Sequence, residues 1–265
     1  MDLEKLCKSV CRCVNQTAEM IRKERENFSI DSGVEVKGHS NFVTYIDKLS
    51  EEKLVDELSK LLPEAGFIAE EGTSNRKGEV YNWVIDPIDG TTNFIHGLTP
   101  HAISVALMRN NEVVLGVVEE ISHNELFYAW EGSKAYLNNE VISVTPISDH
   151  QNALIATGFP YTSFGKMEKY QLCLRELMET TGGVRRLGSA AIDICYIACG
   201  RFEAFWEYGL HPWDVAAGVL ILKQAGGLIT DFKGGNDYIF NGEIIAGNHN
   251  YFSKFYEIVS RHMVS

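Results

Sequence analysis

Residues 83–94 constrain the fold more than any other stretch, because a hydrophobic strand there ends in acidic residues and leads directly into a helix-starting turn. The segment 82–85 is short, apolar and rich in β-branched and aromatic residues, which predicts a buried strand. We expect Pro87 to end this strand. The following Gly90-Thr91-Thr92 favours a tight turn and then the N-cap of a helix.

Asp86 and Asp89 place two carboxylates at the end of this strand, beside the N–H groups of the expected helix start. The carboxylates would repel any anion that these N–H groups bind, unless a cation lies between the two. Hard divalent ions such as Mg²⁺ bind carboxylate and backbone oxygens and often substrate phosphates, and a helix N-terminus binds those same phosphates. The stretch therefore predicts a site for a metal and a phosphate. Asp-Pro and Asp-Gly are also common turn pairs, so residue type alone leaves a purely structural role open.

Two more segments end or begin with acidic residues. Thr44 opens a predicted helix that ends at Pro63, and Asp47 in its first turn suits both a capping box and a catalytic role. The segment 67–72 is typical of a strand and finishes in Glu70-Glu71. This repeats the strand-end arrangement of Asp86 and Asp89.

The string 213–227 is the second distinctive feature of the chain. Small residues on one side of a predicted helix, 215–224, would let that helix approach a sheet closely. Asp214 stands at the expected N-cap of this helix, and an Asp at such a position is most often a cap. A metal-binding role for Asp214 depends on what surrounds it.

Hydrophobic periodicity differs between the two halves of the chain. Residues 2–26 have apolar positions at a three-and-four spacing, which predicts a long amphipathic helix. The segments 103–108, 113–118 and 126–130 are separated by tight polar turns, which predicts an antiparallel sheet. After residue 152 strands and helices alternate, which favours layered α/β packing behind an α+β first half. The predicted elements of the second half are 153–156, 166–179, 184–187, 189–199, 202–207, 215–224, 228–230, 243–246 and 250–259.

Composition excludes several classes of protein. The chain of 265 residues is 45% hydrophobic and has no obvious linker, so we expect a single folding unit, residues 1–265, with approximate halves 1–145 and 146–265. We expect a cytoplasmic protein without a membrane partner, because no apolar run is long enough to span a bilayer. The net charge of −12 argues against nucleic acid as a partner. The six cysteines lack zinc-site spacing and are expected to be free in a reducing compartment.

The string from Asp86 to Asn93 resembles the signature of the inositol monophosphatase family, a branch of the Mg²⁺-dependent, lithium-sensitive phosphatases. The likeness continues over nearly the whole chain, in the segments 37–47, 70–71, 157–161, 188–190 and 207–227. Several ordered motifs are far harder to reach by chance than one. The resemblance implies an alternating α-β-α-β-α sandwich of the inositol monophosphatase and fructose-1,6-bisphosphatase type. It also implies a homodimer, for which the apolar segments 102–118 and 161–164 offer surface.

The resemblance assigns roles to the acidic residues. Glu70, Asp86, Asp89 and Asp214, with the carbonyl of Ile88, would hold two or three Mg²⁺ ions. Four convergent carboxylates would otherwise raise one another's pKa by repulsion. The implied catalytic residues are Asp47, Glu70 and Thr91. Thr91, oriented by Asp47, would take a proton from a water that Glu70 and a metal activate.

The resemblance also implies a substrate site for a small phosphorylated molecule. Backbone N–H groups would bind the phosphate, and side chains near the second signature would face the alcohol. The implied substrate-binding residues are Gly90, Thr91, Thr92, Ser189, Ala190, Glu207 and Asp214. Asn41-Phe42 stands where the family usually has Asp-Leu, and this departure bears on a weaker third metal and on lithium sensitivity.

The residues leave the physiological substrate open. The resemblance implies inositol monophosphate or a related sugar or nucleotide phosphate. Relatives also handle fructose 1,6-bisphosphate, adenosine bisphosphates and the 2′-phosphate of NADP, which are the alternatives. A noncatalytic regulator that binds phosphorylated ligands is the alternative of another class. Arg185-Arg186 precedes the segment 188–190, and bisphosphates become competitive substrates if these arginines point into the site.

Overall fold

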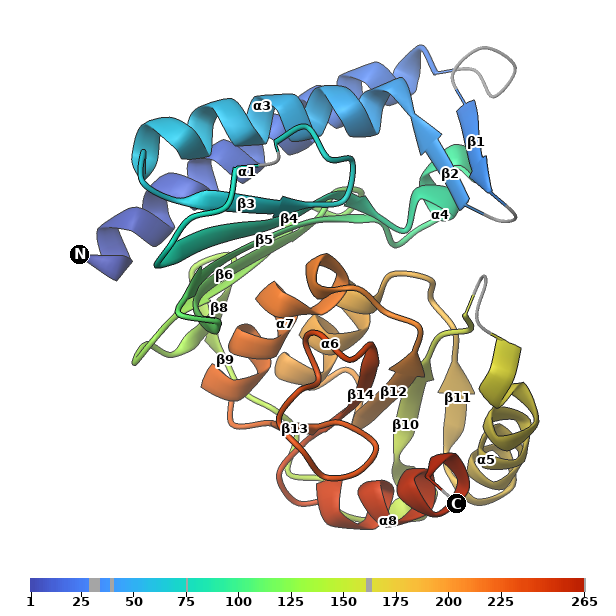
Figure 1. The fold of residues 1–265 in the computed structure, drawn as a ribbon. Helices are drawn as coiled ribbons and strands as arrows, with labels where there is room; N and C mark the ends of the chain where they lie inside the picture. The colour runs from blue at the N-terminus through green and yellow to red at the C-terminus, as the bar shows by residue number, and fades with distance from the viewer. Residues whose placement is uncertain (29–33, 39–40, 75, 161–163, 265) are drawn as a thin grey trace.

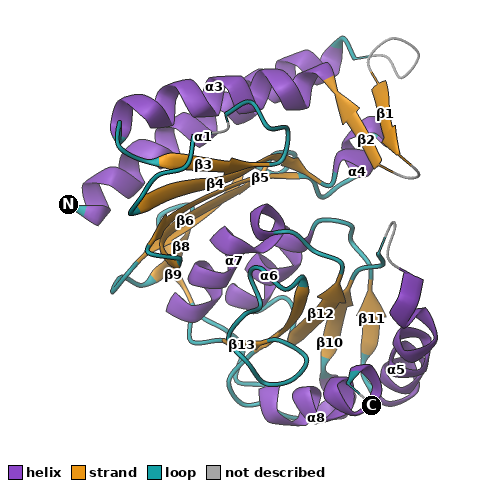
Figure 2. Ribbon diagram, viewed as in Figure 1, coloured by secondary structure: helices purple, strands orange, loops and turns teal. Residues whose placement is uncertain are grey.

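Layers of helices and sheets alternate through the protein in the order α-β-α-β-α (Figure 1). The computed structural model describes residues 1–28, 34–38, 41–74, 76–160 and 164–264. The layered α/β fold predicted from the sequence is confirmed, and the helices of the middle layer separate the two sheets (Figure 2). Hydrophobic side chains from both halves of the chain meet in one of the buried clusters.

The first layer consists of α1 (Leu3–Glu26) and α3 (Tyr45–Leu61), which pack together on one face of the larger sheet. α1 buries the apolar face that its periodicity predicted, including Val10 and Val14. Thr44 caps α3, because its hydroxyl accepts hydrogen bonds from the first-turn N–H groups of the helix. The cap fixes the start of α3 and with it the position of Asp47.

The larger sheet has the strand order β3-β4-β5-β6-β7-β8-β9. β3 runs parallel to β4, and each later strand pairs antiparallel with its neighbour, as the tight turns predicted. The strands are β3 (Gly66–Ala69), β4 (Tyr81–Asp89), β5 (Ala102–Arg109), β6 (Glu112–Glu120), β7 (Glu125–Trp130), β8 (Ala135–Leu137) and β9 (Glu140–Ile142).

The prediction that Pro87 ends its strand is wrong. β4 continues to Asp89, and its pairing with β5 shifts register between Asp86 and Asp89. Proline cannot donate a hydrogen bond to a sheet, but it is tolerated where the ladder is interrupted. The irregularity therefore accommodates Pro87 inside the strand.

The middle layer is formed by α6 (Ala190–Ala198) and α7 (Pro212–Gln224), which cover the opposite face of the larger sheet. Their contact with the sheet is close because the facing residues are small. Gly116 on β6 lies opposite Ala106 and Ala129 on the neighbouring strands, and a Cβ at Gly116 would lie 2.6 Å from the carbonyl oxygen of Ala217. The small residues of the second string thus pack as predicted.

The second sheet has the order β11-β10-β12-β14-β13, and α5 (Met167–Thr180) and α8 (Phe252–Met263) cover its outer face. Each predicted strand and helix of this half is present, with ends that differ by a few residues. The strands are β10 (Leu154–Thr157), β11 (Gly183–Arg185), β12 (Ala204–Tyr208), β13 (Leu228–Thr230) and β14 (Glu243–Gly247).

Shorter elements complete the described chain. β1 (Val34–Gly38) and β2 (Asn41–Thr44) form an antiparallel pair that the sequence analysis missed, and α4 (Thr91–His96) follows β4. Two 3₁₀ turns flank β10, at His150–Asn152 and Phe164–Lys166.

All six cysteines are free, as predicted. Among the described residues, no helix combines the length and the apolar composition needed to cross a bilayer.

The surface proposed for a homodimer needs a correction. The segment 102–118 lies mostly in β5 and β6, whose apolar side chains are buried between the first and middle layers, and its exposed part is the polar turn at 110–112. Of the other proposed segment, 161–163 lies outside the described residues, and Phe164 is exposed. The homodimer itself stays a prediction.

We predict that Gly116→Ala lowers the free energy of unfolding by about 1–3 kcal/mol, the usual cost of overpacking a close contact. The added methyl group would meet the backbone of α7, which cannot move aside as a side chain can. Urea denaturation measures the change. Gly165→Ala is the matched control, since a Cβ there meets nothing within 4 Å. An equal, small effect for both variants would show that α7 and the sheet are not in tight contact.

Candidate metal centre

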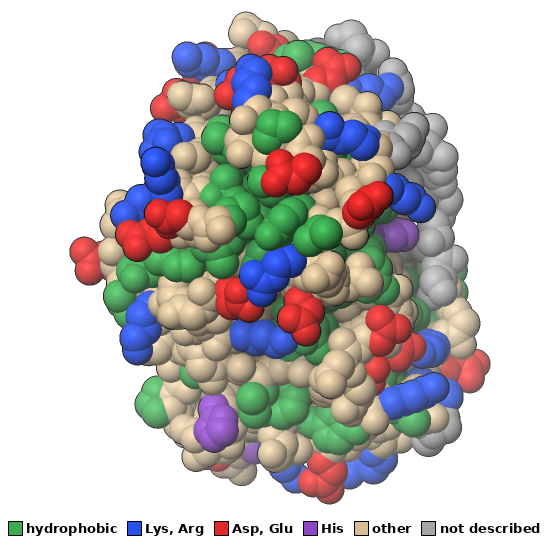
Figure 3. Space-filling model, turned by 60° about the vertical axis from the view of Figure 1, so that its left-hand side comes forward, with side chains coloured by type: hydrophobic (Ala, Val, Ile, Leu, Met, Phe, Trp, Pro, Cys, Tyr) green, Lys and Arg blue, Asp and Glu red, His purple; other side chains and the backbone are tan. Residues whose placement is uncertain are grey.

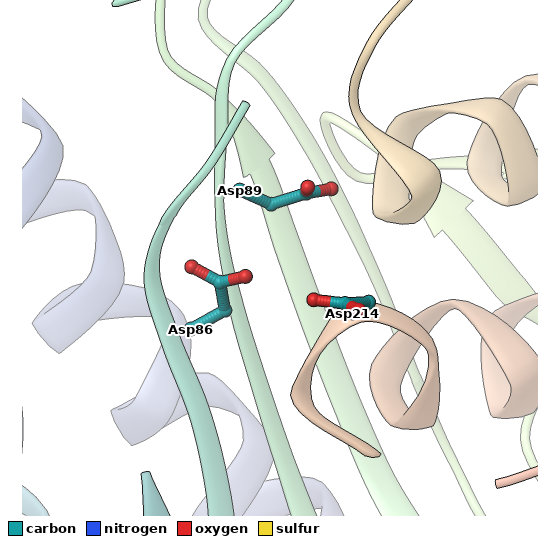
Figure 4. A group of neighbouring side chains, drawn as sticks. All are labelled: Asp86, Asp89 and Asp214. Atoms are coloured by element: carbon teal, nitrogen blue, oxygen red, sulfur yellow. The ribbon is translucent and has the colours of Figure 1, made fainter. Parts of the chain in front are cut away.

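Asp86 and Asp89 reach the same side of the larger sheet because β4 is irregular between them. Residues three apart in a regular strand point to opposite faces. The shift in register removes that constraint, and the N–H of Ile88 donates to Oδ1 of Asp86 over 3.0 Å. Figure 4 shows the carboxylates of Asp86 and Asp89 on the sheet side and that of Asp214 on the facing helix, all in one space.

Asp214 completes the cluster from the middle layer. α7 begins at Pro212 after the N-cap residue His211, so the prediction that Asp214 is the N-cap is wrong. Asp214 is the third residue of the helix, and its Oδ2 accepts the backbone N–H of His211 over 2.7 Å. Each of Asp86, Asp89 and Asp214 offers a carboxylate oxygen, and these oxygens lie within 4.8 Å of one another (Figure 4).

Glu70 lies beside this cluster because β3 and β4 are parallel. Their carboxyl ends meet at one edge, with Ala69 opposite Ile85, and the N–H of Glu70 donates to the carbonyl of Ile85 over 3.2 Å. The loop after Glu70 is tied to α3 by the buried Glu51, which accepts the N–H groups of Glu71 and Thr73 at 2.7 and 2.8 Å. The sequence analysis did not identify this role of Glu51, since a Glu inside a charged helix carries no distinctive signal.

The acidic cluster is electrostatically costly by itself. Burial, and after it the charges of Glu70 and Asp89, raise the pKa of Asp86 well above its usual range. Burial followed by the charge of Asp89 does the same to the pKa of Asp214. Burial raises the pKa of Asp89 to about 6, although hydrogen bonds from Ser189 and Ala191 act in the opposite direction. A bound cation would relieve this repulsion, and an all-oxygen donor set suits a hard ion such as Mg²⁺.

Asp47 and Thr91 form a second group at the edge of the cluster. Oδ2 of Asp47 accepts the N–H and the hydroxyl of Thr44 at 2.8 and 2.5 Å, which leaves Oδ1 to face Thr91. The Thr91 hydroxyl lies 3.3 Å from that Oδ1 and 3.0 Å from the carbonyl oxygen of Ile88. Burial raises the pKa of Asp47 to about 6. Asp47 is therefore part of the predicted capping box and also lies next to Thr91, while its catalytic role stays a prediction.

Gly90 turns the chain from β4 into α4 with a left-handed φ of 90°. A Cβ there would lie 3.0 Å from the carbonyl oxygen of Gly188, so glycine is required by both conformation and space. The structure thus makes Gly90 the N-cap, and Thr91 and Thr92 begin the helix. No side chain caps α4, and the first N–H groups of a helix have no acceptor within it.

Asn93 joins α4 to the opposite wall of the site. Its side-chain amide donates to the carbonyl oxygens of Pro100 and Leu187, each over 2.8 Å. Leu187 precedes the loop that contains Ser189. One buried amide thereby holds the turn after β4 and the start of α6 at a fixed separation.

The acidic cluster lines a cleft of about 320 Å³, together with residues from the start of α6. The cleft is lined by Glu70, Asp86, Ile88, Asp89, Gly90, Thr91, Thr92, Gly158, Phe159, Pro160, Arg186, Gly188, Ser189, Ala190, Asp193, Glu207, Gly209, Leu210, His211, Trp213 and Asp214. Every predicted site residue lines it except Asp47, which lies behind Thr91. The structure therefore gathers residues that are far apart in the sequence into one site.

Further polar residues line the cleft beside the acidic cluster. Ser189 does not simply face the cleft, because its hydroxyl donates to Oδ2 of Asp89 over 2.7 Å, beside the N–H of Ala191 at 2.8 Å. Glu207 is buried on β12, and burial raises its pKa to about 8. Its carboxylate covers Gly158, where a Cβ would lie 2.1 Å from it. Any side chain larger than hydrogen at residue 158 would displace Glu207.

The structure separates the two adjacent arginines. Arg186 lines the cleft, whereas Arg185 is exposed and bonds to the carbonyl of Val184. Asp193, which the sequence analysis missed, also lines the cleft. Its signal was present, since Asp193 is the one charged residue of the otherwise apolar helix α6.

Comparisons with known proteins all identify the same family. The family model described as "Inositol monophosphatase family" matches residues 2–263. An inositol-1-monophosphatase of Mesorhizobium japonicum is 39% identical over 216 residues, 81% of each chain. A protein of Pseudomonas aeruginosa named Nus factor SuhB is 36% identical over 257 residues, 95% of this chain and 94% of that protein.

Solved structures show the same relationship. The extragenic suppressor protein suhB of Bartonella henselae superposes with a TM-score of 0.88 at 34% identity, over 94% of this chain and 95% of that one. The Thermotoga maritima IMPase TM1415 gives a TM-score of 0.85 at 34% identity, over 95% of each chain.

We predict that the metal-free protein loses stability as the pH rises from about 4 to about 8. The raised pKa values of Asp89, about 6, and Glu207, about 8, mean that the folded state binds more protons than the unfolded state across this range. Such stability is complete at low pH and lost as these groups ionise in the folded protein. Denaturant titrations in a chelator measure the slope, and Mg²⁺ should flatten it. A metal-free stability that rises with pH would contradict the assignment.

Proposed function

The chain belongs to the inositol monophosphatase family, and we propose that it is a Mg²⁺-dependent phosphomonoesterase acting on inositol monophosphate or a related sugar or nucleotide phosphate. The observation that carries this proposal is the convergence of Asp86, Asp89 and Asp214 beside Glu70, in a cleft that also contains the start of α4. Buried acids next to uncapped helix N–H groups suit a metal ion and a phosphate together.

The metal ligands of the proposed site are Glu70, Asp86, Asp89 and Asp214, with the carbonyl oxygen of Ile88. Their carboxylates come from the two halves of the chain, and each is within or beside the cluster described above. Bound Mg²⁺ would lower the pKa of a water molecule and offset the charge on the phosphate. Asn41-Phe42 stands where the family usually has Asp-Leu, so this chain would hold a third ion less tightly.

Proton transfer in the proposed reaction belongs to Thr91, Asp47 and Glu70. The Thr91 hydroxyl has two acceptors in reach, Oδ1 of Asp47 and the carbonyl oxygen of Ile88. With its own proton donated to Asp47, its oxygen would be free to accept a proton from the water. Glu70 would orient the attacking water from the other side. The water would then attack phosphorus in line with the departing alcohol.

Phosphate and alcohol would occupy different parts of the cleft. The N–H groups of Gly90, Thr91 and Thr92 would bind the phosphate oxygens, because the start of α4 has no side-chain cap. Ser189, Ala190 and Glu207 line the part of the cleft that the alcohol would enter. Ser189 acts through Asp89, whose orientation its hydroxyl fixes.

Arg186 bears on the choice among substrates. It lines the cleft, which would favour a second phosphate such as that of fructose 1,6-bisphosphate or NADP. The positive charge of Arg186, however, lowers the pKa of Asp89, Asp193 and Glu207. These three neighbouring acids therefore already offset the charge of Arg186. This balance supports a polyhydroxylated monoester over a bisphosphate.

A second candidate is a binding function without catalysis, which the relatives named Nus factor SuhB favour. On the face shown in Figure 3, Lys and Arg side chains alternate with Asp and Glu instead of forming one basic area. The chain's net charge of −12 gives no general attraction to nucleic acid either. A binding partner on this face would have to be recognised by shape and mixed charge, for example another protein.

A phosphate-release assay with inositol monophosphate separates the two candidates. We predict that the natural chain releases phosphate in the presence of Mg²⁺. Asp86→Asn should lose nearly all of this activity, because Asp86 belongs to the acidic cluster. Asp231→Asn is the matched control, since Asp231 is a buried Asp outside the cleft that accepts two backbone N–H groups. Near-normal release by Asp86→Asn would refute the metal assignment, and no release by the natural chain would favour the binding function.

We predict that Thr91→Ala slows turnover by about two orders of magnitude or more, the usual size of a lost proton-transfer group. Metal binding should change little, because Thr91 contributes no charge to the acidic cluster. Single-turnover kinetics and metal titration followed by thermal denaturation measure the two effects separately. If metal binding falls together with turnover, Thr91 holds the cluster in shape instead of moving a proton.

A further inference from the structure

Glu51 is a buried acid outside the cleft whose hydrogen bonds lead toward it. It lies in the second turn of α3, and its side chain is completely buried. Its Oε2 accepts the N–H of Glu71 over 2.7 Å, and its Oε1 accepts the N–H of Thr73 over 2.8 Å. Hydrogen bonds to an ionised carboxylate are stronger than those between neutral groups. Glu51 therefore holds the loop after β3 at two points.

Gly72 lets both N–H groups of this loop reach one carboxylate. It lies between Glu71 and Thr73 and has a left-handed φ of 72°. A Cβ there would meet nothing within 4 Å, so glycine serves the conformation of the loop and not its packing. Turns that contain a left-handed residue can aim nearby N–H groups at a single anion. The loop is thus shaped to receive the side chain of Glu51.

The same loop begins with Glu70, which belongs to the proposed metal site. β3 is an edge strand of the larger sheet, so its end has a neighbouring strand on one side only. On that side the N–H of Glu70 donates to the carbonyl oxygen of Ile85 over 3.2 Å. The next N–H along the chain, that of Glu71, donates to Glu51. The backbone of Glu70 is therefore held between β4 and α3.

α3 supports a second residue of the proposed reaction from the same face. Asp47 and Glu51 are four residues apart, which places them on one side of the helix, and both are buried. Oδ1 of Asp47 lies 3.3 Å from the Thr91 hydroxyl. One face of α3 thus reaches Thr91 through Asp47 and the backbone beside Glu70 through Glu51.

We propose that Glu51 is a positioning residue, which holds the Glu70 carboxylate in the direction needed to bind a metal ion and to orient a water molecule. The proposal rests on the phosphatase function proposed above. Glu51 does not line the cleft, so it acts through Glu70 and not on the substrate. Groups that orient a metal ligand typically contribute about 10–100-fold to metal affinity or activity.

A double-mutant cycle on metal binding tests this role without requiring activity. Glu51→Asp keeps the charge but shortens the side chain by one methylene, so its carboxylate loses the reach to the loop. We expect the dissociation constant for Mg²⁺, measured by calorimetry on the metal-free protein, to rise about tenfold or more. In a Glu70→Gln background the same change should have no further effect, because the carboxylate that Glu51 positions is gone.

Two outcomes of the cycle would overturn the proposal. One is normal Mg²⁺ affinity in Glu51→Asp, and the other is an equal loss of affinity with and without the Glu70 carboxylate. Glu51→Gln keeps the length of the side chain and replaces one acceptor oxygen by a donor. It carries the same comparison if Glu51→Asp does not fold.

Glu203→Asp is the matched control for the loss of buried hydrogen bonds. Glu203 is a buried glutamate outside the cleft, and its two oxygens accept the N–H of Leu154 at 2.6 Å and the hydroxyl of Thr145 at 3.2 Å. Shortening this side chain should leave Mg²⁺ binding unchanged. An equal loss of Mg²⁺ affinity in Glu203→Asp would trace the effect to general destabilisation and refute the positioning role.

Steady-state kinetics add a readout that a purely structural role would not move. At saturating Mg²⁺ we expect kcat of Glu51→Asp for inositol monophosphate to fall about tenfold. KM should change by less than about threefold, because Glu70 would orient the water and not the alcohol. A loss that lies wholly in KM would contradict the proposal.

The positioning role and the phosphatase function fail in different ways. If the natural chain binds Mg²⁺ but releases no phosphate, the phosphatase function fails, and the double-mutant cycle still decides the role of Glu51. If the natural chain releases phosphate and the two substitutions act independently on Mg²⁺ binding, only the positioning role fails. A natural chain that binds no Mg²⁺ would overturn both.

Discussion

Repulsion between buried carboxylates is the constraint on which the site depends. Asp86 and Asp89 belong to the larger sheet, and Asp214 belongs to the helix layer packed against it. Burial and mutual charge hold the pKa values of all three above their usual range. A cation bound between them would therefore also stabilise the contact between the sheet and α7, so folding and metal binding are linked.

The close packing of α7 on the sheet is what brings Asp214 within reach. Gly116 allows the backbone near Ala217 to approach β6, and the row of small residues across the sheet continues this contact. If α7 lay farther from the sheet, its first turn would move away from Asp86 and would take Asp214 with it. The geometry of the acidic cluster is thus set partly by Gly116 and by Ala217, which lies just under one helical turn from Asp214.

Much of this arrangement could be predicted from the sequence, because strand-end acids and helix starts are local patterns. The layered fold and the residues that gather in the cleft followed from such patterns and from the resemblance to a family. Three features did not. Pro87 stays inside β4 because pairing with β5 tolerates a register shift, and Asp214 is the third helix residue because Pro212 begins α7. Asp193 is the one charged residue of α6, but its place in the cleft depends on elements far away in the sequence. The register shift at Pro87 and the position of Asp193 therefore depend on tertiary contacts, whereas Pro212 is a local signal for a helix start that the sequence analysis did not use.

The two hydrogen bonds of the Asn93 amide limit how the substrate preference of such a site can change during evolution. By donating to both Pro100 and Leu187, it couples the turn that would hold the phosphate to the loop leading into α6. Any insertion or deletion in that loop would shift the turn as well. Changes in substrate preference are therefore more readily reached by exchanging side chains on α6 and β12 than by remodelling the loop. Relatives that share the Asn93 bridge should differ in side chains and keep this loop at a constant length.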